Sequence, residues 1–225
     1  VPPDGYLQGV RDLCTKYGIV MMCDEVMAGF GRCGEWFAVN KWGVTPDLIC
    51  FAKGVNSGYV PLGGVVISQK IADTFRDRVF PGGLTYSGHP LACAAAVASI
   101  NIFKEEKIVE HARMLGKDVI GPALEKMKAK HQSVGDVRGL GVFWAIELVK
   151  NRETREPYVP FNASGPDAKP MMDLIVACKE RNLWPFTHFN RIHVVPPCNA
   201  TPNEVREGIA IIDEALTVAD SFHEG

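Results

Sequence analysis

The sequence predicts an α/β fold in which helices alternate with apolar strands. Two continuous apolar runs, at 19–23 and 48–52, are typical of parallel strands that are covered on both faces. A segment with apolar residues at helical spacing precedes the first of them. Because helix-then-strand alternation is typical of layered proteins, we expect a sheet flanked by helices. The composition, 47% apolar and 22% charged, is that of an ordinary globular protein and not of a disordered chain.

The first elements follow in order. Residues 4–16 carry apolar side chains at helical spacing, with Asp4 as the expected N-cap and Gly18 as the expected stop. The two apolar runs named above follow as strands. A third apolar run, at 63–67, predicts another strand, and it leads into a helix near 71–76.

A long apolar helix is expected to close the first part of the chain. Residues 91–98 are apolar on all sides, which predicts a buried helix that continues to Phe103. The charged residues at 104–107 must end that burial. We therefore expect two domains, 1–103 and 104–225.

The second part predicts a smaller α/β unit. Its expected elements are an amphipathic helix (108–131) divided at Gly121-Pro122, two strands across a glycine turn (134–148), a surface loop (152–170), a helix (167–182), a strand (191–195) and a final helix (202–220).

The overall charge and the cysteines limit the classes of partner. A net charge of −2 is too small to indicate nucleic acid or an anionic membrane as a partner, and no apolar run is as long as a membrane span. The seven cysteines are odd in number, widely spaced and without a CxxC pair, so neither a disulfide framework nor a zinc site is indicated. A reducing cytoplasm fits this pattern best.

Charged residues stand where two of the expected strands end. Asp24 ends the first apolar run and Lys53 ends the second. Open α/β sheets bind their ligands at the carboxyl ends of strands, so both residues are candidates for a functional site. On these grounds alone, a buried ion pair between Asp24 and Lys53 is an equally good interpretation.

A longer pattern decides between these interpretations. Residues 22–32 and 45–54 contain D-E-V, G-F-G-R, P-D and A-K-G in this order. The pattern resembles the signature of class-III pyridoxal-phosphate-dependent aminotransferases, the ω-aminotransferases, and in particular their C-terminal portion. Further similarity to this family lies at 58–64, 84–91, 137–141 and 195–197.

The resemblance implies fold type I of the pyridoxal-phosphate transferases, with 1–103 as part of the large cofactor-binding domain and 104–225 as the small C-terminal domain. Lys53 is then the lysine that binds pyridoxal 5'-phosphate and moves the substrate proton. Asp24 matches the aspartate that pairs with the pyridine nitrogen, and Val26 the residue packed on the ring, although plain core remains open for Val26. Thr85 matches the threonine that contacts the phosphate of the neighbouring subunit, which implies a homodimer with shared sites.

The expected reaction is transfer of an amino group from an ω-amino acid or amine to a 2-oxo acid such as pyruvate or 2-oxoglutarate. Residues 143–157 look like those of taurine- or β-alanine-type members. Arg191 lies where many relatives place a carboxylate-binding arginine, and a guanidinium suits that task. In the usual pattern the arginine lies closer to the proline pair 196–197, and His193 occupies that nearer place here.

Two other functions are compatible with the same residues. A mutase or racemase of the same fold would share Asp24 and Lys53. The chain also opens at Val1 without methionine, and it lacks the phosphate-binding loop and the stacking aromatic residue that the resemblance leads us to expect earlier in the family. We therefore expect a fragment, and a catalytically incomplete fragment acting only in dimerisation is the third alternative.

Overall fold

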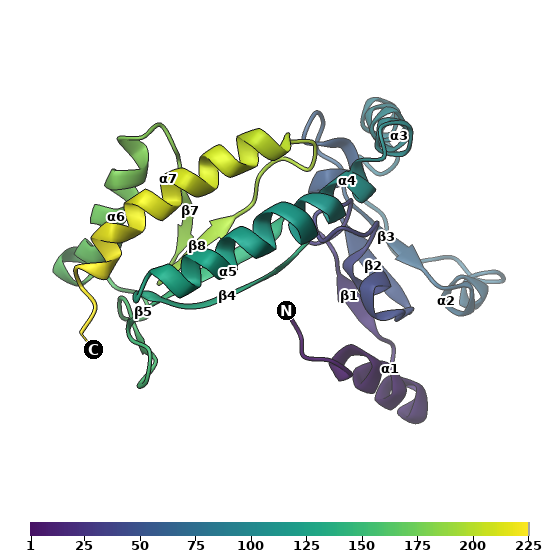
Figure 1. Ribbon diagram of the computed structural model, residues 1–225. Helices are drawn as coiled ribbons and strands as arrows, with labels where there is room; N and C mark the ends of the chain where they lie inside the picture. Colours follow the sequence, from purple (N-terminus) through teal and green to yellow (C-terminus); the bar gives the residue numbers. More distant parts are fainter. Residues whose placement is uncertain (225) are drawn as a thin grey trace. The chain divides into compact units, whose positions relative to one another are not determined.

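The computed structural model describes residues 1–224 and confirms the α/β class (Figure 1). The chain divides into two compact units, Val1–His111 and Ala112–Gly225. The division lies within helix α4 (Ile108–Met114), shortly after the charged segment 104–107 at which we placed the boundary. Val109 is buried in the first unit, next to Gly31, so the first turn of α4 packs with that unit.

The first unit is built around a three-stranded sheet of order β1-β2-β3. β1 and β2 are parallel, with Asp24 opposite Cys50, and β3 is antiparallel to β2. The elements are α1 (Tyr6–Tyr17), β1 (Met22–Asp24), the 3-10 helix η1 (Ala38–Trp42), β2 (Leu48–Phe51), the 3-10 helix η2 (Lys53–Asn56), β3 (Gly64–Ile67), α2 (Gln69–Thr74) and α3 (Pro90–Glu105).

Helix α1 ends where expected and begins later than expected. Gly18 stops the helix in a left-handed conformation, with φ of 66°, as the sequence predicts. The N-cap is Gly5 with φ of 79°, and no side chain caps the helix, so the expected role of Asp4 is wrong. The chain turns left-handed at Gly5, which places Asp4 one residue too far from the first turn.

The strands of the first unit are less covered than their apolar sequences predict. Ile19 and Val20 are each 56% exposed and Met22 is 60% exposed. Within residues 1–224, β1 is an edge strand of a three-stranded sheet, so it has a neighbour on one side only. The prediction of strands covered on both faces is therefore wrong for this chain.

Helix α3 likewise buries one face and not all of its surface. Its buried residues recur at helical spacing: Ala92, Ala96, Ser99 and Phe103. The opposite face carries exposed Leu91, Val97 and Ile102. The all-round burial predicted from composition is wrong, because the described residues cover only one side of α3.

The second unit contains the divided helix, an antiparallel sheet and two further helices. Its elements are α4, the π-helical segment η3 (Leu115–Ile120), α5 (Gly121–Lys130), β4 (Val134–Leu140), β5 (Phe143–Asn151), β6 (Glu156–Pro157), the 3-10 helix η4 (Gly165–Ala168), α6 (Lys169–Lys179), β7 (Phe186–His188), β8 (Arg191–Val194) and α7 (Pro202–Asp220). The predicted division of the first helix is confirmed, and the π-helical segment lies just before Gly121.

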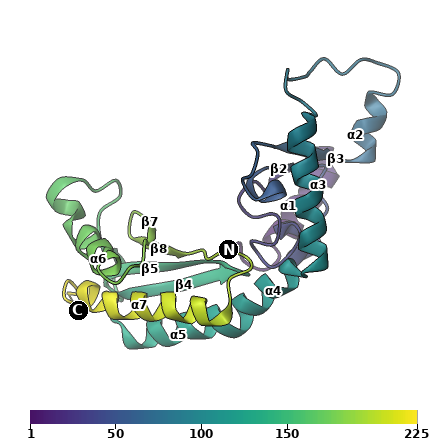
Figure 2. The same ribbon diagram turned by 90° about the horizontal axis from the view of Figure 1, so that it is seen from above.

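The sheet of the second unit has the order β4-β5-β8-β7, with β6 on β5. Figure 2 shows α5 and α7 lying side by side along one face of it. The residues between this face and the helices form the main core, which includes Ile146, Ile192 and Leu216, all fully buried. Arg191 and His193, which alternate with Ile192 along β8, belong to the opposite face.

Two elements of the second unit differ from expectation. The segment 152–170 is not simply a surface loop, because Tyr158 within it is fully buried and its hydroxyl donates to the Pro170 carbonyl at 3.3 Å. Burial raises the pKa of Tyr158 well above its ordinary value. β7 was not predicted, and it is only three residues long.

A buried histidine fixes the last helix to the end of α5. His131 is 1% exposed, with Nδ1 2.6 Å from Asp220 Oδ2 and Nε2 3.0 Å from Asp213 Oδ1. Ser133 donates to Asp220 Oδ1 through both its amide and its hydroxyl. Burial tends to raise the pKa of Asp220, but the hydrogen bonds from His131 and Ser133 hold it below its usual value.

Candidate functional site

Asp24 and Lys53 lie at the same edge of the first sheet. Asp24 is the last residue of β1 and is paired in register with Cys50 of β2. Lys53 follows the end of β2 and begins η2. Because β1 and β2 are parallel, their carboxyl ends meet at one edge, which is where α/β sheets bind ligands.

The backbone at Lys53 is unusual. Its φ is +45°, a left-handed conformation that a lysine seldom adopts and that costs on the order of 1–3 kcal/mol. The next residue, Gly54, packs closely on Phe30, where a Cβ at residue 54 would lie 2.7 Å from Cβ of Phe30. The buried amide of Asn56 donates to the Val60 carbonyl and closes the turn. These contacts hold the backbone of the turn that begins at Lys53.

The side chains of Asp24 and Lys53 are both exposed and do not form an ion pair. Asp24 Oδ1 accepts a hydrogen bond from the Val26 amide at 3.0 Å and has no cationic partner in the described chain. The Lys53 amine makes no hydrogen bond or ion pair within the same residues. The alternative of a buried Asp24–Lys53 ion pair is therefore wrong, because neither residue is buried and they are not joined.

Glu25, next to Asp24, has a structural task that the sequence did not reveal. It is 3% exposed, and its two carboxylate oxygens accept hydrogen bonds from the amides of Ala38 and Val39, each at 2.9 Å. Those amides open η1, where free N–H groups favour a negative charge. Glu25 thus holds the segment after the G-F-G-R motif against the end of β1.

Asp47, the aspartate of the P-D motif, ties the sheet to α1. Its Oδ2 lies 2.8 Å from Arg11 Nη1 and accepts the Met21 amide at 2.8 Å. The hydrogen bond from Arg11, followed by that from Met21, lowers the pKa of Asp47. Its carbonyl accepts from the Ser68 amide at 2.8 Å. An acid before an apolar run was the only signal of this role in the sequence.

Val26 and Thr85 differ in their surroundings. Val26 is half-buried beside Asp24. Thr85 lies in an exposed turn between α2 and α3, and Figure 2 shows this connection looping away from the sheet. The turn is held by the Ser87 amide, which donates to the Leu84 carbonyl at 3.0 Å.

Helix α3, which follows the Thr85 turn, packs against the Lys53 turn. Ser57 Oγ and Ser99 Oγ lie 3.3 Å apart, joining the end of η2 to the buried face of α3. The first unit therefore connects Asp24, Val26 and Lys53 at one sheet edge and attaches the helix after Thr85 to the same turn.

Arg191 belongs to the second unit. It lies on β8, with Nη2 3.3 Å from His188 Nδ1 and its guanidinium 5.9 Å from the Phe189 ring. Its Nε is buried without a hydrogen-bond partner, as is His193 Nδ1. Burial, followed by the positive charge of Arg191, lowers the pKa of His193.

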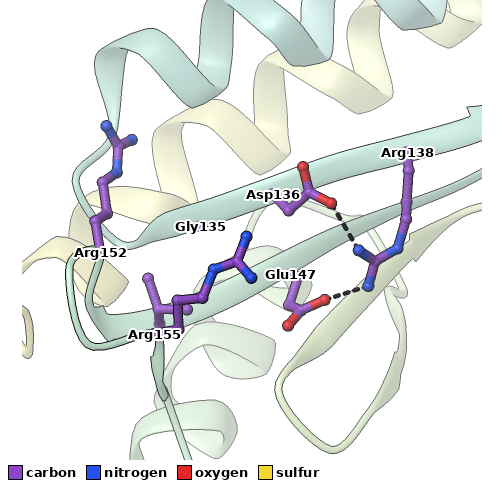
Figure 3. Close-up of a pocket in the computed structure, with 7 residues that line it drawn as sticks. Gly135, Asp136, Arg138, Glu147, Arg152 and Arg155 are labelled. Carbon is purple, nitrogen blue, oxygen red and sulfur yellow. Dashed lines mark hydrogen bonds and ion pairs between the residues drawn. The ribbon is translucent and has the colours of Figure 1, made fainter.

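A pocket of about 180 Å³ lies on the second unit, and none of the predicted site residues lines it (Figure 3). Arg138 bonds to Asp136 at 2.6 Å and to Glu147, so its charge is compensated. Arg152 donates to the carbonyls of Lys128 and His131. These contacts form a network that joins β4, β5 and the end of α5, and the pocket lies beside this network.

Two kinds of feature are absent from residues 1–224. No helix there is long and apolar enough to cross a bilayer. No group of three or more His, Cys, Asp or Glu side chains suits a metal ion in that range.

Comparisons with known proteins identify the family of the chain. The family model for class-III aminotransferases matches residues 1–216. Taurine–pyruvate aminotransferase of Bilophila wadsworthia is 35% identical over 98% of this chain and 49% of its own length. Putrescine–pyruvate aminotransferase of Pseudomonas aeruginosa is 46% identical over 70% of the chain and 35% of its own length.

The solved structures agree. Taurine:2-oxoglutarate aminotransferase from Bifidobacterium kashiwanohense, solved in complex with PLP and glutamate, superposes with a TM-score of 0.92 at 44% identity, over 98% of this chain and 49% of that one. An S-selective transaminase from Arthrobacter gives 0.92 at 31% identity over 98% of the chain. The chain thus spans about half the length of these relatives.

Proposed function

The chain belongs to the class-III aminotransferase family, with the type I fold of pyridoxal-phosphate enzymes, and we propose that it supplies the lysine side of a transaminase active site. In this proposal the first unit is part of the cofactor-binding domain and the second is the small C-terminal domain. The proposed domain ranges are 1–103 for the cofactor-binding part and 104–225 for the small domain.

The observation that carries the proposal is the pair Asp24 and Lys53. An unpaired carboxylate and an unpaired amine follow neighbouring parallel strands at one edge of the sheet. Two opposite charges left apart, with a backbone held in a costly conformation, indicate a group that fits between them. A pyridinium nitrogen suits the carboxylate and an aldehyde suits the amine, so these residues fit pyridoxal 5'-phosphate.

The roles of the residues follow from their chemistry. When bound, the cofactor supplies a carbonyl that condenses with amino groups and a ring that accepts electrons. The Asp24 carboxylate would keep a proton on the ring nitrogen, because an adjacent anion favours the protonated form. The Lys53 amine would hold the cofactor covalently and then carry the substrate proton as base and acid. Val26 would pack against the ring.

We propose a homodimer with shared sites. The exposed face of α3, with Leu91, Val97 and Ile102, is apolar and is uncovered by residues 1–224. A symmetric interface would cover it and bring the Thr85 turn toward the neighbour. Thr85 would then contact the cofactor phosphate of the other subunit.

The free state of all seven cysteines supports a cytoplasmic, reducing location.

The proposed reaction moves an amino group from an ω-amino acid or amine, taurine and β-alanine included, to pyruvate or 2-oxoglutarate. Relatives named for taurine, putrescine and 5-aminovalerate support this donor range. A mutase or racemase would turn over without an amino acceptor. Activity that requires a 2-oxo acid therefore separates transaminase from these alternatives.

Borohydride fixation tests the assignment of Lys53. The native protein is incubated with pyridoxal phosphate, reduced, digested and analysed by mass spectrometry. We expect the phosphopyridoxyl group on the peptide that contains Lys53, and loss of the label in Lys53→Ala. Lys41→Ala, which removes an exposed lysine of η1, is the matched control and should keep the label. A label that persists in Lys53→Ala would refute the assignment.

A further inference from the structure

Glu25 is the middle residue of the turn that carries Asp24. Asp24 Oδ1 accepts the Val26 amide at 3.0 Å, so the side chain of Asp24 closes a turn over Glu25. This bond occupies one carboxylate oxygen and leaves Oδ2 of Asp24 without a partner in residues 1–224. The direction of that free oxygen therefore depends on the backbone conformation of Glu25.

The backbone of Glu25 is held on both sides. Its amide donates to the Cys50 carbonyl of β2 at 2.9 Å, and its carbonyl accepts the Gly29 amide at 2.9 Å. A Cβ at residue 29 would lie 2.9 Å from the Glu25 carbonyl oxygen, so the close approach favours glycine there. Both peptide groups that flank Glu25 are thus fixed to neighbouring segments.

The Glu25 carboxylate adds a third attachment. It is buried, and its oxygens accept only the amides of Ala38 and Val39, at the start of η1. No cationic side chain pairs with this carboxylate within residues 1–224. A buried charge that two backbone amides alone compensate is costly unless both bonds are well made. The carboxylate therefore favours one position of residue 25 relative to η1.

We propose that Glu25 is a positioning residue, which fixes the turn so that Asp24 Oδ2 is directed at the ring nitrogen of pyridoxal phosphate. The inference rests on the proposed transaminase function and adds to it a residue that acts through Asp24. Glu25 itself touches neither cofactor nor substrate. A displaced Asp24 would hold the ring proton less firmly, because a charge-assisted hydrogen bond weakens as its distance and angle depart from the optimum.

Binding of ring-¹⁵N-labelled pyridoxal phosphate to the native protein tests the inference without turnover. The ¹⁵N chemical shift reports whether the ring nitrogen carries a proton, and we expect a protonated nitrogen in the native protein. Glu25→Gln keeps the shape but places an NH₂ donor against a backbone N–H. We expect binding to weaken about 3- to 10-fold, with the ¹⁵N signal shifted toward the unprotonated form. Glu25→Asp, which keeps the charge but is shorter, should have the same effect, because positioning and not charge is the task.

A double-mutant cycle tests the dependence on Asp24. Asp24→Asn alone should remove the ring proton and weaken binding about 10- to 100-fold, the effect of a lost hydrogen bond to a charged group. Glu25→Gln in the Asp24→Asn background should then change binding by less than about twofold, since the residue through which Glu25 acts is gone. The loss of stability that Glu25→Gln causes should remain in that background.

Two further variants separate positioning from folding. Asp47→Asn is the matched control, because the Asp47 carboxylate accepts the Met21 amide just before β2; it should lower stability and leave the ring proton unchanged. If Glu25→Gln fails to fold, Ala38→Pro removes one donor and keeps Glu25. Proline is tolerated at the first position of a helix, and the preceding Phe37 is extended, with φ of −130° and ψ of 140°. Ala38→Pro should shift the ¹⁵N signal in the same direction.

The outcomes distinguish the inference from the proposed function. Glu25 variants that lose stability but keep a protonated ring nitrogen and native affinity would overturn the inference and leave the role of Asp24 intact. An equal loss of binding from Glu25→Gln with and without Asp24 would also overturn it. A native protein that does not bind pyridoxal phosphate, or whose ring-nitrogen signal is the same in Asp24→Asn, would refute the proposed function and the inference with it.

Discussion

Gly116→Ala is a sharp test of the packing in the second unit. Gly116 lies in the π-helical segment η3, against the turn between β4 and β5. A Cβ there would lie 2.0 Å from the Gly141 carbonyl oxygen and 2.6 Å from its carbon, both backbone atoms. No side-chain rotation can relieve that overlap, so the turn must move by about 1 Å to restore van der Waals contact.

The magnitude follows from two opposing effects. Overpacking of this kind costs about 1–3 kcal/mol or more. Replacing glycine in a helix recovers up to ~1 kcal/mol. We expect a net loss of about 2 kcal/mol, which corresponds to a fall in Tm of about 4–8 °C for a chain of this size.

The assay has a local reporter. The Gly141 carbonyl also accepts the indole N–H of Trp144 at 2.8 Å. Displacing the Gly141 carbonyl should weaken this hydrogen bond and shift the Trp144 indole resonance in a ¹H–¹⁵N spectrum. The loss of stability is measured separately by unfolding in urea.

Gly208→Ala in α7 is the matched control for Gly116→Ala, since its Cβ would meet only Leu183 at 3.9 Å. It should stabilise the protein by up to ~1 kcal/mol. An unchanged Trp144 resonance together with unchanged stability in Gly116→Ala would refute the reasoning.

Three further predictions concern the site and the core. Asp24→Asn should lower turnover by about 10²–10³-fold while Tm moves by less than about 2 °C, because Asp24 is exposed and unpaired; a large loss of Tm with normal turnover would contradict the proposed role. Mixed dimers of Lys53→Ala and Thr85→Ala subunits should regain activity at one site in two, whereas no recovery after confirmed subunit exchange would exclude shared sites. Stability should fall with acid, because hydrogen bonds from His131 and its neighbours hold the pKa of Asp220 below its usual value of about 4. The contribution of the Asp220 carboxylate to the free energy of unfolding is present above that value and is lost as the pH falls through the lower folded pKa. In Asp220→Asn this part of the fall in stability at acid pH should be missing.

Several features of this chain could be read from local sequence. The final helix was predicted with its bounds, 202–220, and in the structure Thr201 and Glu204 form a capping box at its start, which is a local sequence pattern. The glycine turn between β4 and β5 and the stop at Gly18 follow from backbone conformations that glycine adopts easily. The family pattern around Asp24 and Lys53 combines residue type with spacing, and both are properties of the sequence itself.

Burial and pairing could not be read in the same way. An apolar run shows that a strand can be covered, but it does not show which segment covers it, and Met22 and Val97 are exposed in this chain. Three outcomes depend on contacts made in the folded chain. Asp24 and Lys53 form no ion pair, Glu25 accepts hydrogen bonds at the start of η1, and Glu147 pairs with Arg138 and not with Arg191. The sequence by itself determined the elements and the chemical groups at their ends, because these depend on local spacing. Tertiary structure decided which charges are compensated within residues 1–224 and which are not, because that depends on long-range contacts.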